Sequence, residues 1–363
     1  MPAQRLLLTG ANTLTGSHIL HHLLSFDVSV RAVVATREEA QAIHQQYPND
    51  DTSRLDFATV HPADIAIPGS FDDALSGYPE PFDTIIHTVS ADPSEEADCL
   101  SRFINQETDT LTNFLRSVKD VATSVRRVVI VTSLSPFARW LVDPQVERSP
   151  HGNNPSSSHR NAEIDSEYVL ATSQASDNIV YDALWRWRRD ANAQFDLVSL
   201  TAPSIYGPSL RPLENSSDIH EANRRVWNIC SNDSVEHLTS PPYGIDYYTD
   251  VRDLAVAAVQ AAVVPEASNR RFVISAGTMP SGSAVGDFLI GRFPEFGSRI
   301  RSNPSPPHRS PSGEIPLDFI DTRLATSILR LGAYRSVEET LTDLAGQILE
   351  LQRRKDWKTV TQS

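Results

Sequence analysis

Residues 6–18 of the chain read Leu-Leu-Leu-Thr-Gly-Ala-Asn-Thr-Leu-Thr-Gly-Ser-His. An apolar segment runs directly into a turn that contains Gly10 and Gly16, and apolar residues at helical spacing follow. This strand–turn–helix order is typical of a nucleotide-binding βαβ unit, because backbone N–H groups at a helix N-terminus can receive a pyrophosphate. Thr13 stands where a glycine is usual, so its side chain is expected to narrow the approach of backbone to phosphate.

The composition excludes several classes of protein. The chain has 363 residues, 40% of them hydrophobic, and a formal net charge of −14. The acidic balance argues against nucleic acid or an anionic membrane surface as a partner. An apolar run of the roughly 18 residues that a membrane span needs does not occur, and no secretory leader is expected. Two cysteines, Cys99 and Cys230, fit a reducing compartment such as the cytoplasm. No metal is predicted, since no cluster has metal-ligand spacing.

Strand-like and helix-like segments alternate along most of the chain. The predicted strands, rich in β-branched or apolar residues, lie at 5–8, 29–35, 59–62, 84–87, 127–132 and 196–200. Helical patterns lie between them, for example at 104–119 and 178–193. This alternation predicts an α/β fold with a doubly wound parallel sheet and helices on both faces. Residues 143–163 are expected to form a long loop, from which His151 or His159 could close over a substrate.

Several short motifs follow one another along nearly the whole chain. They are Thr9-Gly10-Ala11-Asn12 with Gly16, Asp64, Ile86-His87-Thr88-Val89-Ser90, Thr132-Ser133, Ala202–Pro208, Asp250–Ala255 and Ser336–Thr340. In these motifs and their order the chain resembles the extended short-chain dehydrogenase/reductase family (NAD-dependent epimerase/dehydratase type). Within it, the chain is similar to the branch of dihydroflavonol reductase and yeast methylglyoxal reductase.

The resemblance implies a domain organisation. A dinucleotide-binding Rossmann domain would span residues 1–204, and a helix at 251–263 would return to it. A smaller C-terminal substrate lobe would comprise residues 205–250 and 264–335, and residues 336–363 would form a terminal helix and tail.

The resemblance also implies a cofactor site. Its expected residues are Gly10, Asn12, Thr13 and Gly16 at the pyrophosphate, Asp64 at the adenine, Val89 and Ser90 beside the adenosine ribose, and Pro203 and Ile205 near the nicotinamide. The second strand ends without the acidic residue that would bind a free ribose 2′-hydroxyl. Arg37, with Arg31 as a helper, could face a 2′-phosphate instead, which favours NADP (NADPH) over NAD. A solvated charge at a helix start is the alternative for Arg37.

The family's catalytic set is incomplete in this chain. Reductases of the family use a Ser, a Tyr and a Lys, in which the tyrosine gives a proton to the substrate oxygen and the lysine lowers the tyrosine's pKa. Ser133 aligns with the serine, but Ser173 takes the tyrosine position and Asp177 the lysine position. Tyr168 could supply a proton from a neighbouring turn. No lysine occurs between Lys119 and Lys355, so the loss does not depend on the alignment.

Three functions therefore stay open. The first is an NADP(H)-dependent reductase of a ketone or aldehyde on a small metabolite, in a specialised (secondary-metabolite) pathway. The second is a redox-neutral isomerase, dehydratase or cyclase that uses Ser133 with Asp177 as acid and base. The third is a non-catalytic nucleotide-binding protein, in which Asp177 is an exposed helix residue.

The substrate is expected to be a small molecule. Aromatic residues of the smaller lobe make an aromatic or polyketide-like molecule plausible, although aromatics also fill cores; they are Tyr206, Trp227, Tyr243, Tyr247 and Tyr248. The protein is expected to be a monomer or a homodimer.

Overall fold

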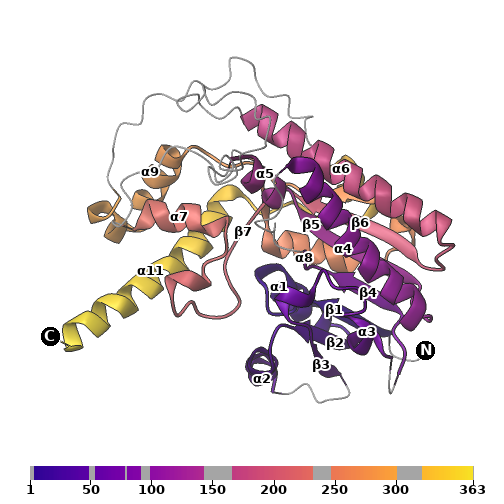
Figure 1. Ribbon diagram of the computed structural model, residues 1–363. Coiled ribbons are helices and arrows are strands. Elements are labelled where there is room, and N and C mark those ends of the chain that lie inside the picture. The colour runs from indigo at the N-terminus through magenta and orange to yellow at the C-terminus, as the bar shows by residue number, and fades with distance from the viewer. Residues whose placement is uncertain are drawn as a thin grey trace.

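The computed structural model describes residues 4–48, 54–77, 80–90, 99–142, 166–231, 247–300 and 321–362. Figure 1 shows a larger part that carries the strands and a smaller part built mainly of helices. The loop predicted at 143–163, with His151 and His159, lies outside the described residues, as does Tyr243.

A seven-stranded parallel sheet forms the centre of the larger part. Its strands are β1 (Gln4–Thr9), β2 (Val28–Val34), β3 (Leu55–Thr59), β4 (Thr84–His87), β5 (Arg127–Ser133), β6 (Asp196–Ala202) and β9 (Arg271–Val273). Their order is β3-β2-β1-β4-β5-β6-β9, with every neighbouring pair parallel. The order reverses between β1 and β4, as in a Rossmann fold. The predicted doubly wound parallel sheet is confirmed.

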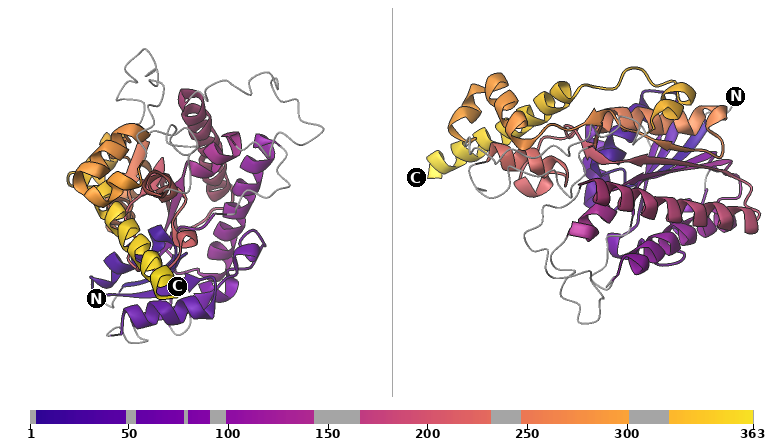
Figure 2. Two further views of the ribbon diagram at one scale, coloured as in Figure 1. Left: turned by 90° about the vertical axis from the view of Figure 1, so that its left-hand side faces the viewer. Right: turned by 90° about the horizontal axis from the view of Figure 1, so that it is seen from above.

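Helices cover both faces of this sheet, as the view from above in Figure 2 shows. They are α1 (Leu14–Leu24), α2 (Arg37–Gln46), α3 (Asp72–Leu75), α4 (Leu100–Val121), α5 (Ser135–Val142), α6 (Ser166–Asp190), α8 (Val251–Val263) and α10 (Arg323–Ile328). Alternate strand residues face opposite sides, so Leu8 packs with α1 and α8, whereas Leu7 packs with α4 and α6. None of the helices in the described ranges has the length and apolar character that a membrane span requires.

Two strands differ from their predicted places, and charged side chains explain both. The third strand lies at Leu55–Thr59, not at 59–62. Its Asp56 weakens the apolar pattern, but the carboxylate pairs with Arg31 at 2.7 Å and with Arg5 at 3.0 Å across the sheet. The second difference concerns β9, because the predicted domain boundaries placed residues 264–335 in the smaller lobe. It extends the main sheet beside β6, and Arg271 in it binds Asp177 of α6.

The smaller part combines a short sheet with a helical core. Its strands are β7 (Ser204–Tyr206), β8 (Tyr247–Asp250) and β10 (Gly277–Thr278), and its helices are α7 (Asn223–Cys230), α9 (Gly282–Arg292) and α11 (Val337–Gln362). Tyr206 and Tyr248 are buried in the core that these helices share, and Tyr247 is buried in a second cluster beside Leu134. These three tyrosines fill the interior, so they give no support to an aromatic substrate.

The start of α8 ties the two parts together through ion pairs. Asp250 caps the helix by accepting from the Arg252 N–H at 2.8 Å, and its side chain also accepts from Thr340 of α11 at 2.7 Å. Arg252 reaches Asp343 of α11, and Asp253 binds Arg335 just before that helix. These contacts tie the start of α11 to the larger part, while the helix runs along the smaller part (Figure 1).

Replacement of Gly16 by alanine is expected to disrupt the junction of β1 and α1. A Cβ at this position would lie 2.0 Å from the Gly10 carbonyl oxygen, so backbone must move. We expect a loss of about 1–3 kcal/mol in the free energy of unfolding, measured by urea denaturation. Gly346→Ala in α11 is the control, since nothing lies within 4 Å of its added Cβ and alanine favours a helix by about 0.5–1 kcal/mol. Equal stability of the two variants would contradict the prediction.

Candidate functional site

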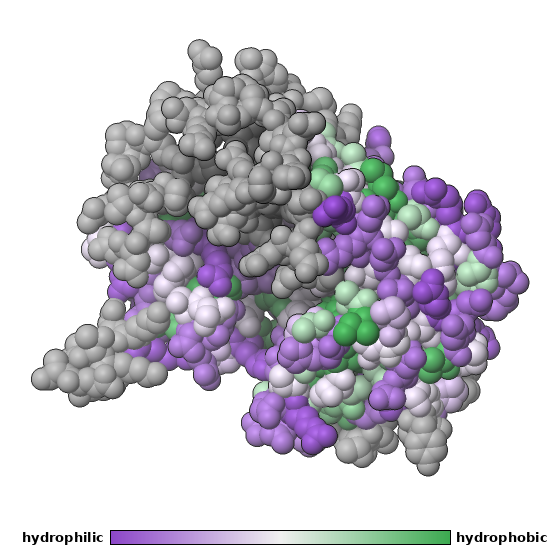
Figure 3. Space-filling view, viewed as in Figure 1, coloured by the Kyte–Doolittle hydropathy of each residue, from purple (hydrophilic) through white to green (hydrophobic). Residues whose placement is uncertain are grey.

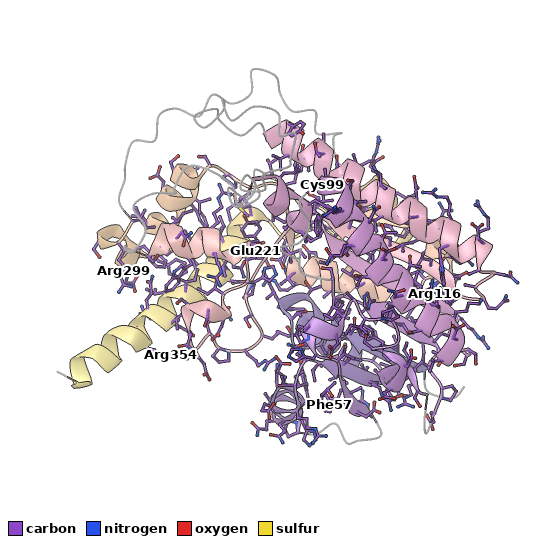
Figure 4. The ribbon with its side chains drawn as sticks, in the orientation of Figure 1. Phe57, Cys99, Arg116, Glu221, Arg299 and Arg354 are labelled. Atoms are coloured by element: carbon purple, nitrogen blue, oxygen red, sulfur yellow. The ribbon has the colours of Figure 1, made fainter. Side chains whose placement is uncertain are left out.

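A cleft opens at the carboxyl ends of the central strands, where the strand order reverses. Its volume of about 380 Å³ lies in the usual range of ligand pockets, roughly 300–1,000 Å³. The β1–α1 turn, the ends of β2, β4 and β5, and residues after β7 form its walls. Figure 4 places one lining residue, Glu221, between the two parts of the molecule. Figure 3 shows apolar residues near the boundary between the two parts, while hydrophilic residues cover much of the outer described surface.

The glycine turn is held tightly against the end of β4. Gly10 has a φ of +66°, and a Cβ there would lie 2.6 Å from Val89 Cγ1 and 2.7 Å from Thr88 Oγ1. Only glycine combines that conformation with that close approach. Thr88 fixes the approach, because its hydroxyl donates to the Thr9 carbonyl at 2.7 Å. Gly10 and Val89, two of the residues that the resemblance implies for a cofactor site, both line the cleft.

Thr13 has a structural role that the sequence did not reveal. Its hydroxyl donates to the Gly10 carbonyl at 2.8 Å and accepts from the Gly16 N–H at 3.0 Å, which makes it the N-cap of α1. The side chain therefore turns back into its own loop while the residue still lines the cleft. Asn12 also lines the cleft and donates to Glu39 at 2.9 Å. Gly16 lies behind the turn and is not a lining residue.

The other end of the cleft only partly matches the predicted adenosine site. Ala35 and Ile65 line it, but Asp64 and Arg37 are exposed and do not. The expectation that Arg31 helps Arg37 is wrong, because the Arg31 guanidinium is held by Asp56 and by the Ala74 and Ser76 carbonyls. The hydrogen bonds to these three partners engage the guanidinium N–H groups that a phosphate would need.

The side chain of Glu39 lies near the end of β2, in the first turn of α2. Its carboxylate accepts from the Ala35 N–H at 2.9 Å and from the Thr36 N–H at 3.1 Å, while the Thr36 hydroxyl accepts from the Glu39 N–H. This capping box begins α2. The Thr-Arg-Glu-Glu sequence at 36–39 carries the pattern of such a box, so sequence reasoning could have found it.

Ser133 lies at the end of β5 and lines the cleft. In the sheet, β1 and β4 separate this strand from β2, which Ala35 follows. Its hydroxyl lies 3.0 Å from the Pro203 carbonyl and 3.1 Å from Ser135 Oγ, and it accepts from the Ser135 N–H at 3.1 Å. Ser135, the first residue of α5, was not predicted as a site residue. Ile205 lines the same region, whereas Pro203 is not a lining residue and its carbonyl accepts from the Ser133 and Ser135 hydroxyls.

Asp177 is buried, so the interpretation that it is an exposed helix residue is wrong. It is 5% exposed, and its carboxylate pairs with Arg271 of β9. The same carboxylate accepts from Thr201 at 2.9 Å and from Thr132 at 3.4 Å. Burial raises the pKa of Asp177, whereas Arg271 and the two threonine hydroxyls oppose that rise.

The other two predicted catalytic residues are not brought to the cleft. Ser173 is fully buried, and its hydroxyl has no hydrogen-bond partner among the described residues. Tyr168, one turn earlier on α6, is 60% exposed. Neither residue is among those that line the cleft. Ser173 lies four residues before Asp177 and shares its buried face of α6, whereas Tyr168 lies on an exposed part of the helix. Asp177 does not line the cleft either.

A second, smaller cavity of about 20 Å³ lies behind Ser133. Asp177 lines it together with Glu107, a residue of α4 that the sequence analysis did not select. Glu107 is 7% exposed. Burial, and then the nearby charge of Asp177, raise the pKa of Glu107 to about 8. The only sequence signal was a glutamate on the buried face of an amphipathic helix between Phe103 and Leu111.

The comparisons with known proteins decide the family. The model of the NAD dependent epimerase/dehydratase family matches residues 6–275. The chain belongs to this family. Ketoreductase azaE of Aspergillus niger is 24% identical over 82% of the chain and 85% of its own length. The NADPH-dependent methylglyoxal reductase GRE2 of Saccharomyces cerevisiae is 22% identical over 95% of the chain and 98% of its own length.

Solved structures agree with this family in fold. The structure of yeast methylglyoxal/isovaleraldehyde reductase Gre2 complexed with NADPH covers 97% of this chain and 100% of its own, with a TM-score of 0.69 and 20% identity. Vestitone reductase from alfalfa covers 95% of this chain and 98% of its own, with a TM-score of 0.59 and 16% identity. The family fold therefore extends over the smaller part of the molecule as well.

Removal of Arg271 is expected to destabilise this family member strongly. Arg271→Met would leave the buried Asp177 carboxylate without its cation, and the loss of one partner of a buried pair costs about 3–5 kcal/mol. Urea denaturation measures the change in the free energy of unfolding. Adding Asp177→Leu in the same chain should recover most of the loss, because both charges are then gone.

The matched control is Arg323→Met, which removes an arginine from an exposed pair with Asp321. Its effect should stay below about 1 kcal/mol, because water screens exposed pairs. A loss for Arg271→Met no larger than that of this control would contradict a structural role for the buried pair.

Proposed function

We propose that the protein is an NADP(H)-dependent reductase of a ketone or aldehyde group on a small metabolite. One observation carries the proposal. A single cleft begins at a glycine turn suited to a pyrophosphate and ends at Ser133, the hydroxyl at the family's catalytic serine position. The similarity to a ketoreductase and to an NADPH-dependent methylglyoxal reductase supports a carbonyl group as the target.

The residues around the cleft fit a dinucleotide. At Gly10 a Cβ would meet Thr88 and Val89, so the lack of a side chain lets the turn lie against the end of β4, and α1 begins beside the cleft, where a helix N-terminus favours an anion. Gly10, Asn12 and Thr13 would hold the pyrophosphate, and the turn that contains Asp64 would meet the adenine. Val89 would contact the adenosine ribose. Ile205 would contact the nicotinamide ring, with Pro203 behind it.

The chemistry at the other end would centre on Ser133. When bound, NADPH would supply a hydride to the carbonyl carbon. The Ser133 hydroxyl would donate to the carbonyl oxygen and orient the substrate. The Ser135 N–H, which donates to Ser133 Oγ, would keep that hydroxyl in place. The Ser133 hydrogen, which donates to the Pro203 carbonyl, would turn to the substrate oxygen when substrate binds. Positioning of this kind retains much of the rate advantage when a general acid has been lost.

The redox-neutral alternative is less well supported. It needs the Asp177 carboxylate to face a substrate, but three side chains already donate to that carboxylate. A role in a specialised biosynthetic pathway, a cytoplasmic location and a monomeric or homodimeric state stay predictions.

The cofactor preference can be measured by titrating the protein with NADPH and NADH while following tryptophan fluorescence. We expect micromolar binding of NADPH and weaker binding of NADH, because Arg37 at the start of α2 would attract the 2′-phosphate. Arg37→Ala should weaken NADPH binding about tenfold, which is roughly 1.4 kcal/mol, and leave NADH binding unchanged.

Arg116→Ala is the matched control, since Arg116 is exposed as Arg37 is but lies within α4 and not at the start of α2 (Figure 4). Equal binding of NADPH and NADH by the wild-type protein would contradict the NADP preference. Absence of binding of either nucleotide at millimolar concentration would contradict the proposed function.

Ser133→Ala is expected to impair the chemical step and not the binding of cofactor. NADPH-dependent reduction of a panel of aldehydes and ketones should fall roughly 10- to 1,000-fold in kcat, the effect of losing one hydroxyl that acts on the developing oxyanion. The dissociation constant of NADPH should stay within about twofold of wild type. Ser298→Ala, exposed in the turn at Pro294–Ser298, is the control. Unchanged kcat in Ser133→Ala would rule out this role.

A further inference from the structure

The small cavity behind Ser133 connects the cleft with the buried acids of the interior. Ser90, Thr132, Ser133 and Pro136 line both the cleft and this cavity, so the two spaces share a wall. The volume of about 20 Å³ suffices for one water molecule, which needs roughly 10–15 Å³. Hydroxyl groups and carboxyl groups around it could bind that water.

Glu107 contributes a carboxyl group to this cavity from α4, and apolar side chains make up half of the cavity wall. The hydrophobic residues around it come from three helices and are Phe103, Leu111, Pro136, Phe137 and Val180. An ionised carboxylate in such surroundings is costly unless a cation or several donors compensate it. Among the described residues no salt bridge to Glu107 is found, and Arg271 is paired with Asp177.

The charges that face Glu107 all favour its neutral form. Asp177 of α6 adds negative charge, and it is the neighbour that, after burial itself, raises the pKa of Glu107. Arg271 of β9 is paired with Asp177. His87 of β4 is stacked on Phe114 further along α4 at 3.8 Å, and burial lowers the pKa of His87 to about 3, so it adds no charge. Glu107 therefore holds a proton at neutral pH.

We propose that Glu107 stores the proton that the reaction consumes and passes it to the Ser133 hydroxyl through a water in the small cavity. Glu107 does not touch the substrate in this scheme; it is a positioning residue that acts through Ser133. The inference rests on the proposed reductase function. It accounts for the absence of the family's Tyr and Lys, because a buried neutral acid can supply a proton without either residue.

The proton transfers balance. The carbonyl carbon gains the hydride, the π electron pair of the carbonyl moves to oxygen, and this oxygen takes the proton of the Ser133 hydroxyl. Ser133 regains a proton from the water, and the water regains one from Glu107. The Glu107 carboxylate is then reprotonated from solvent. NADPH is the reductant, and each turnover consumes one proton.

The test compares Glu107→Gln with the wild-type protein over a range of pH. In the wild type, kcat/KM should fall as the pH rises through about 8, because Glu107 must be protonated to act. Glu107→Gln keeps the size of the side chain but supplies no acidic proton. It should lower kcat/KM about 10²- to 10⁴-fold and abolish the alkaline fall.

Two further variants separate a proton role from a structural one. Asp177→Asn should move the alkaline fall to lower pH, because the negative charge that raises the pKa of Glu107 is gone. Asp109→Asn changes an exposed carboxylate on the same helix and should leave both the rate and the pH profile unchanged. Glu107→Gln that retains the wild-type rate and pH profile would overturn the proposal.

A readout without substrate or cofactor distinguishes this proposal from the proposed function. The infrared carbonyl band of a protonated carboxyl group should be present at pH 7, disappear as the pH rises through about 8, and be missing in Glu107→Gln. Absence of this band at pH 7 would overturn the proton store even in an active reductase. If the band is present but the wild-type protein binds no NADPH and reduces no carbonyl compound, the proposed function is overturned and the catalytic role of Glu107 falls with it.

Discussion

The ion pair between Asp177 and Arg271 is the interaction on which the rest of the site depends. It joins α6 to β9, and the Thr201 hydroxyl of β6, the strand beside β9, donates to the same carboxylate. Because both charges lie below the protein surface, each needs the other. The pair thereby holds the last strand of the sheet, the helix that carries the altered catalytic positions, and the floor of the cleft in one arrangement.

The pair also determines the electrostatics behind the cleft. By the resemblance to the family's reductases, Asp177 is expected to take the position of a lysine, which would put a reversed charge where a cation is usual. Arg271 supplies a compensating cation from β9, and the two charges nearly cancel at the ends of β5 and β6. Burial, and then the nearby charge of Asp177, raise the pKa of Glu107. In place of the expected lysine, the site has the ion pair between Asp177 and Arg271 and, beside it, the protonated carboxyl group of Glu107.

Much of the fold could be predicted because it depends on local patterns. The β4 strand at Thr84–His87 and the α8 helix at Val251–Val263 were predicted with their observed ends, since both are short apolar segments with clear boundaries. The β3 strand was misplaced because Asp56 is polar, and only the neighbouring strand shows why a carboxylate is tolerated there. The membership of β9 in the main sheet depends on a pairing between residues about seventy positions apart, which no local pattern records.

The features of the site also fall into those that a local sequence pattern predicts and those that depend on contacts between distant segments. The sequence alone determined the glycine turn at Gly10, the serine at the end of β5 and the absence of lysine from residues 120–354, because each depends on residue type at one place in the chain. Only the tertiary structure decided that Asp177 is buried against Arg271 and that Glu107 lies beside it. Burial raises the pKa of a carboxyl group only when chain segments far apart in sequence exclude water around it together. That exclusion is a property of the packed helices and strands, and no single segment carries it.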